Sequence, residues 1–132
     1  MKLFSAVAAV ALLMSGSAAL ADADLKAGQK VFKKCKACHA VGEKARNKVG
    51  PQLNGVVGAD WGHIQGYKYS KALKAGKEEG RVWDDETLAA YLRKPKDVIP
   101  KGKMAFAGLR KDKDIVNVIA YLEQFNADGT KK

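Results

Sequence analysis

Two cysteines and a histidine stand together at residues 35–39, in the order Cys-Lys-Ala-Cys-His. This C-x-x-C-H pattern is typical of the attachment site of a c-type haem. Each thiol adds to one vinyl group of the porphyrin, so the two sulfurs must be spaced to reach one edge of the ring. The imidazole that follows can then reach the iron as an axial ligand. The pattern predicts one covalently bound haem, held by Cys35 and Cys38, with His39 on the iron.

Three other uses of a C-x-x-C pair compete with haem attachment: a disulfide, half of a zinc site and a thioredoxin-like dithiol. A four-cysteine zinc site needs a second pair, and the chain has two cysteines in total. A thioredoxin motif opens a helix after a buried strand, whereas a charged, helix-like segment with Lys30, Lys33 and Lys34 precedes this pair. These observations favour haem over the three alternatives.

The second axial position of the iron has few candidate ligands in this chain. Met104 is the one methionine outside the first 21 residues, and His63 is the one other histidine. Met104 lies in a stretch between two expected helices, where its thioether could be held against the distal face of the haem. A lone methionine is more often core filler, but next to a haem motif the ligand role is favoured. His63 is its competitor.

The first 21 residues have the pattern of a secretory signal peptide. Lys2 is followed by an apolar run over residues 3–14, and Ala-Leu-Ala at residues 19–21 fits a cleavage site. A membrane-spanning helix needs about 20 apolar residues, so we expect cleavage rather than a retained anchor. Bacteria attach c-type haem outside the cytoplasmic membrane, which agrees with export. We therefore expect a cleaved signal peptide at 1–21 and one domain at 22–132 in the periplasm.

The expected mature chain is small and basic. Its 111 residues suffice for one compact domain. Lys2 is the only charge lost with the signal peptide, so the formal charge of +10 becomes +9. Such a domain suits an acidic partner, an anionic membrane surface or nucleic acid. Nucleic acid fits least, because the chain has no recognisable nucleic-acid-binding motif.

Hydrophobic periodicity predicts an all-α domain. Apolar positions at helical spacing, N-capping aspartates and the helix-ending Pro95 indicate helices at about 25–36, 71–75, 84–94 and 112–125. Between 40 and 70 glycine is frequent and periodicity is absent, and 96–109 has the same character. Loops this long are unusual in a compact domain, but a haem accounts for them because a loop can pack on the ring.

Taken in order, the pieces of the chain resemble class I c-type cytochromes, the family of mitochondrial cytochrome c and the bacterial cytochromes c-two. The resemblance covers the whole mature chain. Besides the haem motif, the matching residues are Gly28, Phe32, Gly50, Pro51, Leu53, residues 55–58, Tyr67, Tyr69, Trp83, Thr87, Leu88, Tyr91, Leu92, Pro95, Ile99, Pro100, Lys103, Met104, residues 106–108, Val118 and Tyr121.

The resemblance implies a cytochrome c fold of about four to five helices wrapped around one haem. It implies a close crossing of the first and last helices at Gly28, with Phe32 near Tyr121. The Pro51 carbonyl would accept a hydrogen bond from the His39 ring and so orient it. It also implies that Tyr69 and Trp83 donate hydrogen bonds to a buried haem propionate and that Tyr91 lies near the Met104 sulfur. Tyr67 would either pack in the core or contact a propionate.

The chain departs from the family pattern at three places. Ala59 stands where an arginine is common, and Gly102 stands where a threonine often binds a propionate. Residues 77–80 form an apparent insertion relative to the mitochondrial form. Trp61 and His63 lie in the altered loop that begins with Ala59.

A His/Met-ligated iron has both axial positions filled, so the resemblance implies an electron carrier and not an enzyme. Its partners would be acidic faces of membrane redox complexes: a cytochrome bc-type complex as donor, and a terminal oxidase or a photosynthetic reaction centre as acceptor. The protein itself would be a monomer. Two alternatives are a peroxide-reactive haem enzyme and a haem subunit or sensor of a larger redox complex. The lysines expected to meet the partner are Lys33, Lys34, Lys36, Lys48, Lys96, Lys101 and Lys103.

Overall fold

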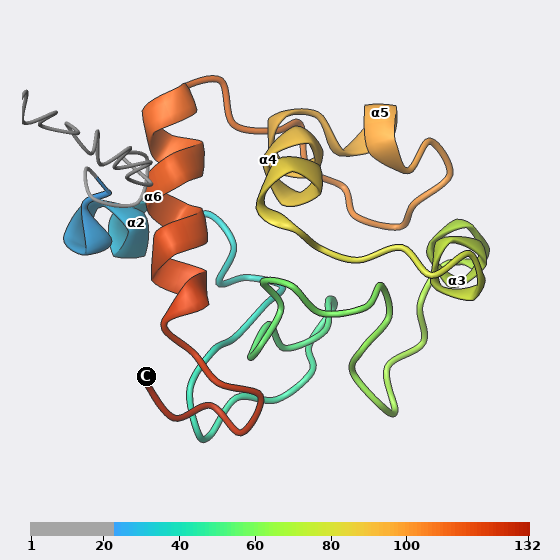
Figure 1. Cartoon of the computed structure of the whole chain (residues 1–132), viewed down its shortest axis with the longest axis horizontal. Coiled ribbons are helices and arrows are strands. Elements are labelled where there is room, and N and C mark those ends of the chain that lie inside the picture. Colours follow the sequence, from blue (N-terminus) through green and yellow to red (C-terminus); the bar gives the residue numbers. More distant parts are fainter. Residues whose placement is uncertain (1–22) are drawn as a thin grey trace, which may run out of the picture.

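The computed structural model describes residues 23–132, so the expected signal peptide at 1–21 lies outside the described residues. The described part contains no strand beyond two isolated bridges, Asp60 with Val82 and Phe125 with Lys131. Figure 1 shows the helices around long irregular segments, which confirms the predicted all-α class. The helices are α2 (Leu25–Phe32), α3 (Lys71–Glu78), α4 (Asp85–Arg93), α5 (Pro95–Val98) and α6 (Asp112–Glu123).

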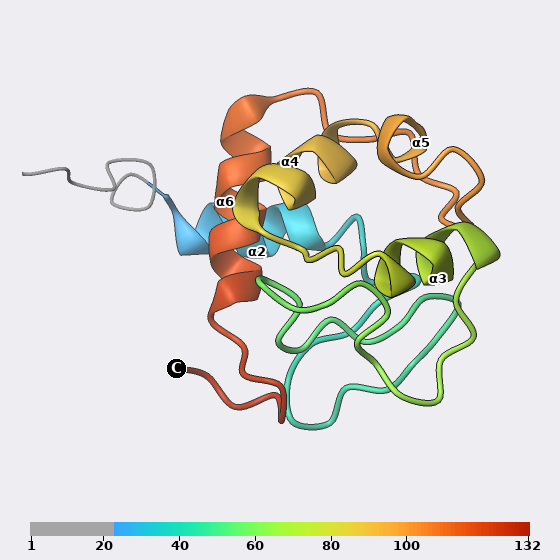
Figure 2. The same cartoon turned by 45° about the vertical axis from the view of Figure 1, so that its right-hand side comes forward.

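The first and last helices cross in close contact. Figures 1 and 2 both show α2 passing beside α6. Gly28 makes the crossing possible, because a methyl group there would overlap the Asn117 carbonyl and lie 2.9 Å from Cβ of Tyr121. The Phe32 and Tyr121 rings pack with centroids 5.5 Å apart. The predicted crossing at Gly28 is thus present.

Side-chain caps fix the start of α2 and tie it to α6. The Asp24 carboxylate accepts a hydrogen bond from the Ala27 amide at 3.0 Å, as expected for an N-cap. The Asp24 amide donates to Oδ1 of the buried Asn117 at 2.9 Å. Asn117 therefore satisfies a helix-start amide of α2 from within α6.

Helix bounds differ from the sequence prediction in α2, α3, α5 and α6, where α6 ends at Glu123 rather than near residue 125. The first helix ends at Phe32 rather than near residue 36, because the amides of Lys33, Lys34 and Cys35 bond to carbonyls three residues back and tighten the chain into turns. The second helix, α3, continues through Gly76 to Glu78 instead of ending at residue 75. Helix α5 was expected to be loop. Pro95 both follows α4 and starts α5, where a missing amide hydrogen is harmless.

The buried apolar side chains form one core cluster. Buried side chains of α6 pack with Phe32 and Leu88. The same cluster extends toward α3, where Trp61 is 1% exposed and stacks on Trp83 with centroids 4.7 Å apart. Gly76 allows α3 to approach, since a Cβ there would overlap the Trp61 ring. Within residues 23–132 no helix has the length and apolar character to cross a membrane.

Candidate functional site

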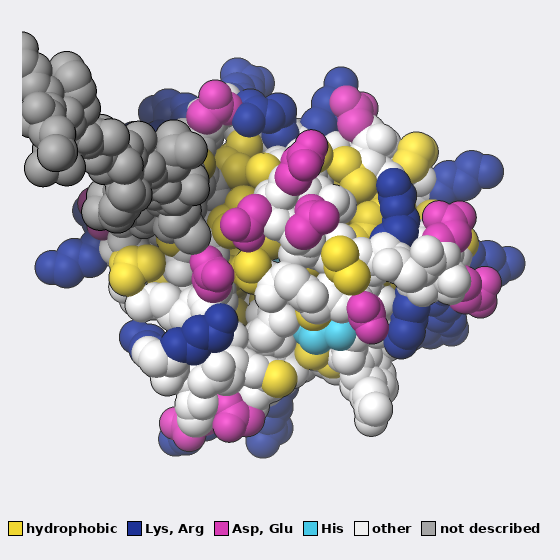
Figure 3. Space-filling model, viewed as in Figure 1, with side chains coloured by type: hydrophobic (Ala, Val, Ile, Leu, Met, Phe, Trp, Pro, Cys, Tyr) yellow, Lys and Arg dark blue, Asp and Glu magenta, His cyan; other side chains and the backbone are white. Residues whose placement is uncertain are grey.

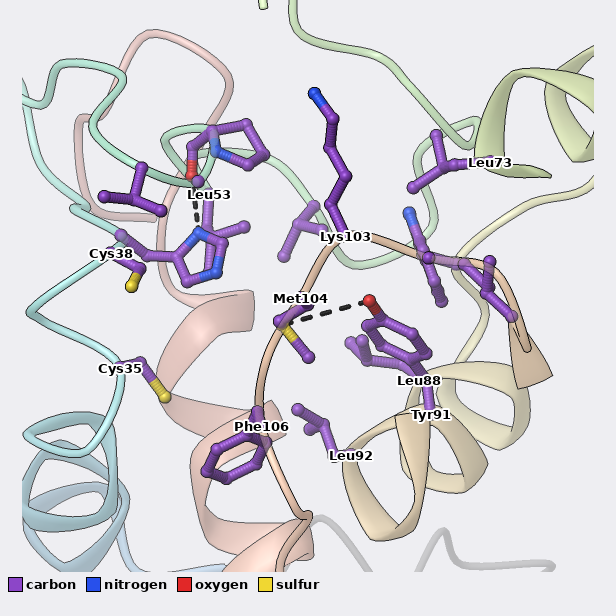
Figure 4. Close-up of a pocket in the computed structure, with 18 of the residues that line it drawn as sticks. Cys35, Cys38, Leu53, Leu73, Leu88, Tyr91, Leu92, Lys103, Met104 and Phe106 are labelled. Carbon is purple, nitrogen blue, oxygen red and sulfur yellow. Dashed lines mark hydrogen bonds between the residues drawn. The ribbon is translucent and has the colours of Figure 1, made fainter. Parts of the chain in front are cut away.

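A cavity of about 380 Å³ lies between the helices and the two irregular segments. This volume is in the range of ligand-binding pockets. The cavity is lined by all four residues predicted to hold the haem: Cys35, Cys38, His39 and Met104. Figure 4 shows Cys35 and Cys38 on one side of it and Met104 across from them. The fold thus brings the C-x-x-C-H segment together with the loop that contains Met104, residues 99–111, which we call the methionine loop.

The His39 ring is fixed by a carbonyl group. Its Nδ1 lies 2.7 Å from the Pro51 carbonyl oxygen. Because a carbonyl can only accept, Nδ1 carries the hydrogen and Nε2 keeps its lone pair. Burial lowers the pKa of His39, and the bond to Pro51 partly opposes this, so the ring is neutral at pH 7. A neutral imidazole with a free Nε2 is the form that binds a metal.

Gly50 gives the His39 ring its space. A Cβ at this position would overlap the ring carbon between the two nitrogens. The backbone on either side is tied down, since the Gly50 amide donates to the Cys38 carbonyl at 2.9 Å. The proximal wall is therefore built by backbone that packs directly on the imidazole.

The two cysteines are separate, half-buried thiols. Burial and the neighbouring Cys38 raise the pKa of Cys35, with Lys34 opposing them, so this sulfur is a thiol at neutral pH. The turn between them is short: the Cys38 and His39 amides both donate to the Cys35 carbonyl, at 3.1 and 2.9 Å. Neither thiol is in a disulfide, so both are in the form that thioether formation requires.

Met104 is contacted by Tyr91 of α4. The Tyr91 hydroxyl lies 3.8 Å from the Met104 sulfur, as a weak hydrogen bond (Figure 4). Burial raises the pKa of Tyr91 to about 12, with a smaller contribution from Tyr67. The hydroxyl therefore stays protonated and remains a donor at neutral pH. The predicted proximity of these two side chains is present in the structure.

The aromatic residues expected near the haem propionates all line the cavity. The Tyr67 hydroxyl donates to the Val49 carbonyl at 2.6 Å. The Tyr69 hydroxyl accepts from the Ile64 amide at 3.1 Å, which leaves its own hydrogen free to donate. Trp83 is buried on Trp61. Contacts of Tyr67, Tyr69 and Trp83 with a propionate stay predictions.

The seven lysines predicted to meet a partner are all exposed. Lys34 and Lys103 also line the cavity. The Lys103 ammonium donates to the Lys68 carbonyl at 2.5 Å and lies 5.8 Å from the centre of the Tyr67 ring, so it joins the methionine loop to the loop before α3. Lys48 donates to the Lys36 carbonyl at 3.0 Å. Lys96 borders a separate hollow beside Phe106.

Charge is unevenly spread over the surface. On the face in Figure 3, acidic side chains gather over α4 and basic side chains surround the outline. The acidic group includes Asp85 and Glu86 in the first turn of α4, where negative charge favours the helix. On this face, acidic and basic side chains thus occupy different areas.

His63, the alternative distal ligand, also lines the cavity. Its Nε2 lies 3.1 Å from the Asn54 carbonyl oxygen. The His63 ring is therefore hydrogen-bonded within its own loop, whereas Met104 projects from the methionine loop toward Tyr91 (Figure 4). This arrangement favours Met104 as the ligand.

Two parts of the site were not identified from the sequence. One is the apolar wall, which includes Leu73, Leu88, Leu92 and Phe106 (Figure 4). The other is Asn54, 3% exposed, whose side chain bonds both the amide and the carbonyl of Gly42 at 2.9 and 2.8 Å. Helical spacing marks the wall leucines as buried without saying what they face. Nothing in the pattern around Asn54 marks it.

The donor set of the cavity fits a haem c. Two unjoined thiols, a neutral imidazole nitrogen and a thioether sulfur all line one mostly apolar cavity. Thioether attachment needs the first pair, and His/Met ligation of iron needs the other two groups.

Comparisons with known proteins agree with this donor set. The sequence profile of the family "Cytochrome c" matches residues 25–126. A cytochrome c-550 of Ancylobacter novellus is 54% identical over 104 residues, which is 79% of this chain and 97% of that protein. A cytochrome c2 of Afifella marina is 50% identical, over 78% of this chain and 83% of that protein. The solved structure of cytochrome c2 from Rhodospirillum centenum superposes with a TM-score of 0.73 at 38% identity, covering 78% of this chain and 98% of that one.

Proposed function

The chain belongs to the cytochrome c family and is an electron carrier with a covalently bound haem c. On that premise we propose that Cys35 and Cys38 hold the haem, that His39 and Met104 ligate its iron, and that the protein shuttles electrons in the periplasm. The donor would be a cytochrome bc-type complex, and the acceptor a terminal oxidase or a photosynthetic reaction centre. The observation that carries the ligand assignment is the shared cavity of the C-x-x-C-H segment and Met104.

The side chains around the cavity suit a carrier whose iron ligands stay in place. When bound, the haem supplies a one-electron couple between ferric and ferrous iron. The bond from His39 to Pro51 fixes the imidazole, and Tyr91 holds the Met104 thioether. A methionine ligand favours ferrous iron, and an apolar wall disfavours the extra charge of ferric iron. Both effects raise the reduction potential.

The exposed lysines supply a means of guiding a partner to the cavity. Lys34 and Lys103 line its edge, and Lys48 lies against the C-x-x-C-H segment through its bond to Lys36. Opposite charge on a partner raises the rate of encounter and orients the pair. We propose that an acidic partner docks here, with Lys33, Lys36, Lys96 and Lys101 adding to the attraction as exposed charges.

The location of the protein follows from its proposed maturation. We propose that residues 1–21 direct export and are removed, and that the mature domain at 22–132 receives its haem in the periplasm. Mass spectrometry of the protein from the periplasmic fraction tests this. A mature chain that begins at Asp22 and carries one haem is expected, and an uncleaved chain in the membrane fraction would contradict it.

The ligand assignment is tested with Met104→Ala. The oxidised wild type should show the near-infrared band of methionine bound to ferric haem, and the variant should lose the band and have a lower midpoint potential. His63→Ala is the matched control and should keep the band. A band that persists in Met104→Ala, or that is lost in His63→Ala, would refute ligation by Met104.

The docking surface is tested by the ionic-strength dependence of electron transfer to a purified acceptor complex. The second-order rate should fall steeply as salt is added, because salt screens the attraction. Lys34→Gln and Lys103→Gln should each lower the rate at low salt several-fold, whereas Lys113→Gln on α6, which does not line the cavity, should leave it nearly unchanged. A salt-independent rate in the wild type would exclude this surface.

A further inference from the structure

His63 carries a buried polar atom that nothing described above uses. The residue lines the cavity. Its ring Nε2 lies 3.1 Å from the Asn54 carbonyl oxygen. Its ring Nδ1 is buried and has no hydrogen-bond partner among residues 23–132. Buried polar atoms without a partner are rare, and each calls for an explanation such as a missing ligand group.

The contact with Asn54 determines what Nδ1 can do. A carbonyl oxygen only accepts, so Nε2 of His63 must carry a hydrogen. In a neutral ring Nδ1 is then an unprotonated acceptor, and in an imidazolium it is a second donor. An ionised carboxylate can only accept. A carboxylate facing Nδ1 would therefore accept a hydrogen bond from the imidazolium form of His63.

The haem supplies such carboxylates, and this loop lacks the usual cation for one of them. Ala59 stands four residues before His63, at the position where the resemblance places an arginine. The nearby aromatic hydroxyls are partly engaged, since Tyr67 donates to Val49 and Tyr69 accepts from Ile64. The loop thus holds one buried nitrogen that can supply both a hydrogen and a positive charge.

We propose that Nδ1 of His63 binds a haem carboxylate and that the two share one titrating proton. The proposal rests on the proposed haem site. Here His63 is a positioning residue: Asn54 holds its ring, and its second nitrogen holds the cofactor and sets part of its potential. In this proposal His63 is not an iron ligand, and Met104 remains the proposed one.

The other charged and titratable groups near His63 are few. Lys77 of α3 donates its ammonium to the Gly62 carbonyl at 3.2 Å, next to His63 in the chain. Tyr69 contacts the Ile64 amide on the other side, and Tyr67 packs on Tyr69 with ring centroids 4.8 Å apart. No aspartate or glutamate forms an ion pair with His63 in the described part of the chain. Lysine and tyrosine titrate well above neutral pH, so a step near neutral pH belongs to His63 and its carboxylate.

The shared proton makes the potential depend on pH with a definite sign. Oxidation of the iron adds a positive charge, which lowers the proton affinity of His63 and its carboxylate. The reduced protein therefore binds the proton more tightly than the oxidised protein. The midpoint potential must fall as pH rises through the range in which the proton is released, and must level off on either side.

The test compares the potential of the holoprotein against pH in the wild type and in His63→Gln. Glutamine can still donate to the Asn54 carbonyl but has no proton to release. We expect the wild type to show a downward step between about pH 5 and 8, the range in which histidine titrates. The variant should lack the step and stay at the lower, alkaline value of the wild type throughout. Gln65→Ala, an exposed position in the same loop, should keep the step. Identical curves for His63→Gln and the wild type would overturn the proposal.

A second measurement serves if His63→Gln fails to mature. Nitrogen-15 spectra of the reduced wild type report which ring nitrogens carry hydrogen. We expect both nitrogens of His63 to be protonated on the acid side of the step. An unprotonated Nδ1 from about pH 5 to 8 would overturn the proposal. The methionine-to-iron band is recorded on the same preparation after oxidation: its absence from the oxidised wild type would refute the proposed ligation, whereas its presence, with an unprotonated Nδ1 in the reduced protein, would refute only the role of His63.

Discussion

The crossing of α2 and α6 and the loops around the cavity are stabilised in different ways. At the crossing, Gly28, Phe32, Asn117 and Tyr121 contact one another directly, and side chains of the chain itself fill the space. The loops at 39–70 and 99–111 instead turn apolar side chains toward a cavity of about 380 Å³. Protein interiors are normally close-packed. The crossing is thus filled by side chains of the chain itself, whereas the loops need a cofactor to complete their core. The crossing helices still border the cavity, because Phe32, Val118 and Leu122 also line it.

Removal of the haem should have the largest effect on stability. It tests whether the crossing of α2 and α6 survives without the cofactor. The variant Cys35→Ala/Cys38→Ala cannot attach haem covalently. Helices of 8 and 12 residues, such as α2 and α6, are marginal without tertiary packing. We expect loss of cooperative unfolding and of most helical circular dichroism at 25 °C. A cooperative transition with the helix content of the holoprotein would show that the crossing and loops do not depend on haem.

Gly28→Val should be the most damaging single change at the crossing. The added side chain would overlap the Asn117 carbonyl, which is backbone and cannot rotate away. We expect the free energy of unfolding of the holoprotein to fall by more than about 3 kcal/mol in urea titrations. Gln29→Val, exposed on the same helix, is the control and should cost about 0.5 kcal/mol. Equal losses for the two variants would mean that α2 and α6 are not in contact at Gly28.

Gly50→Ala is the matching change in the loops. Its methyl group would overlap the His39 ring, but a loop can shift more than a helix crossing. We expect a smaller loss of unfolding free energy, about 2 kcal/mol, together with a shifted midpoint potential because the imidazole turns away from Pro51. Arg46→Ala, exposed in the same segment, should change neither quantity. A stability loss with an unchanged potential would show that Gly50 does not position His39.

Tyr91→Phe should have the smallest effect at neutral pH and a clear one at high pH. The pKa of Tyr91 is about 12 in the folded protein, above the ordinary value of about 10. The folded state therefore holds the phenol proton more tightly, and this contribution to stability is lost as pH rises from about 10 to 12. We expect unfolding free energy to fall over this range by about 1 to 2 kcal/mol more in the wild type than in Tyr91→Phe. Parallel curves would mean that the hydroxyl is solvated.

The sequence predicts the crossing better than the loops. The N-cap Asp24, the glycine at residue 28 and the apolar stripe of α6 are local signals, and the structure has all three features. The misjudged elements depend on packing instead. The helix expected at 71–75 continues through Gly76 to Glu78, where the Trp61 ring packs against the glycine. Pro95 indicated a stop, yet it also begins α5.

The site likewise has parts that could be predicted from the sequence and parts that could not. The C-x-x-C-H segment and the methionine were predictable because haem chemistry restricts residue type and spacing. The bonds of His63 to Asn54 and of Lys103 to Lys68 were not, because their acceptors are backbone carbonyls, which every residue has. Leucines that line the cavity have the same helical spacing as leucines of an ordinary core, so periodicity could not separate them.

The crossing of α2 and α6 also has a kinetic consequence. These helices lie near the two ends of the described domain, so the contact that completes the core joins the most distant parts of the chain. Contacts of high sequence separation form slowly, because the intervening chain must first be closed into a loop. In the proposed export, the C-terminal helix would also be the last to emerge. Until it arrived, the segment with Cys35 and Cys38 would lack its partner helix, which would give the proposed attachment reaction time to proceed before folding encloses the thiols.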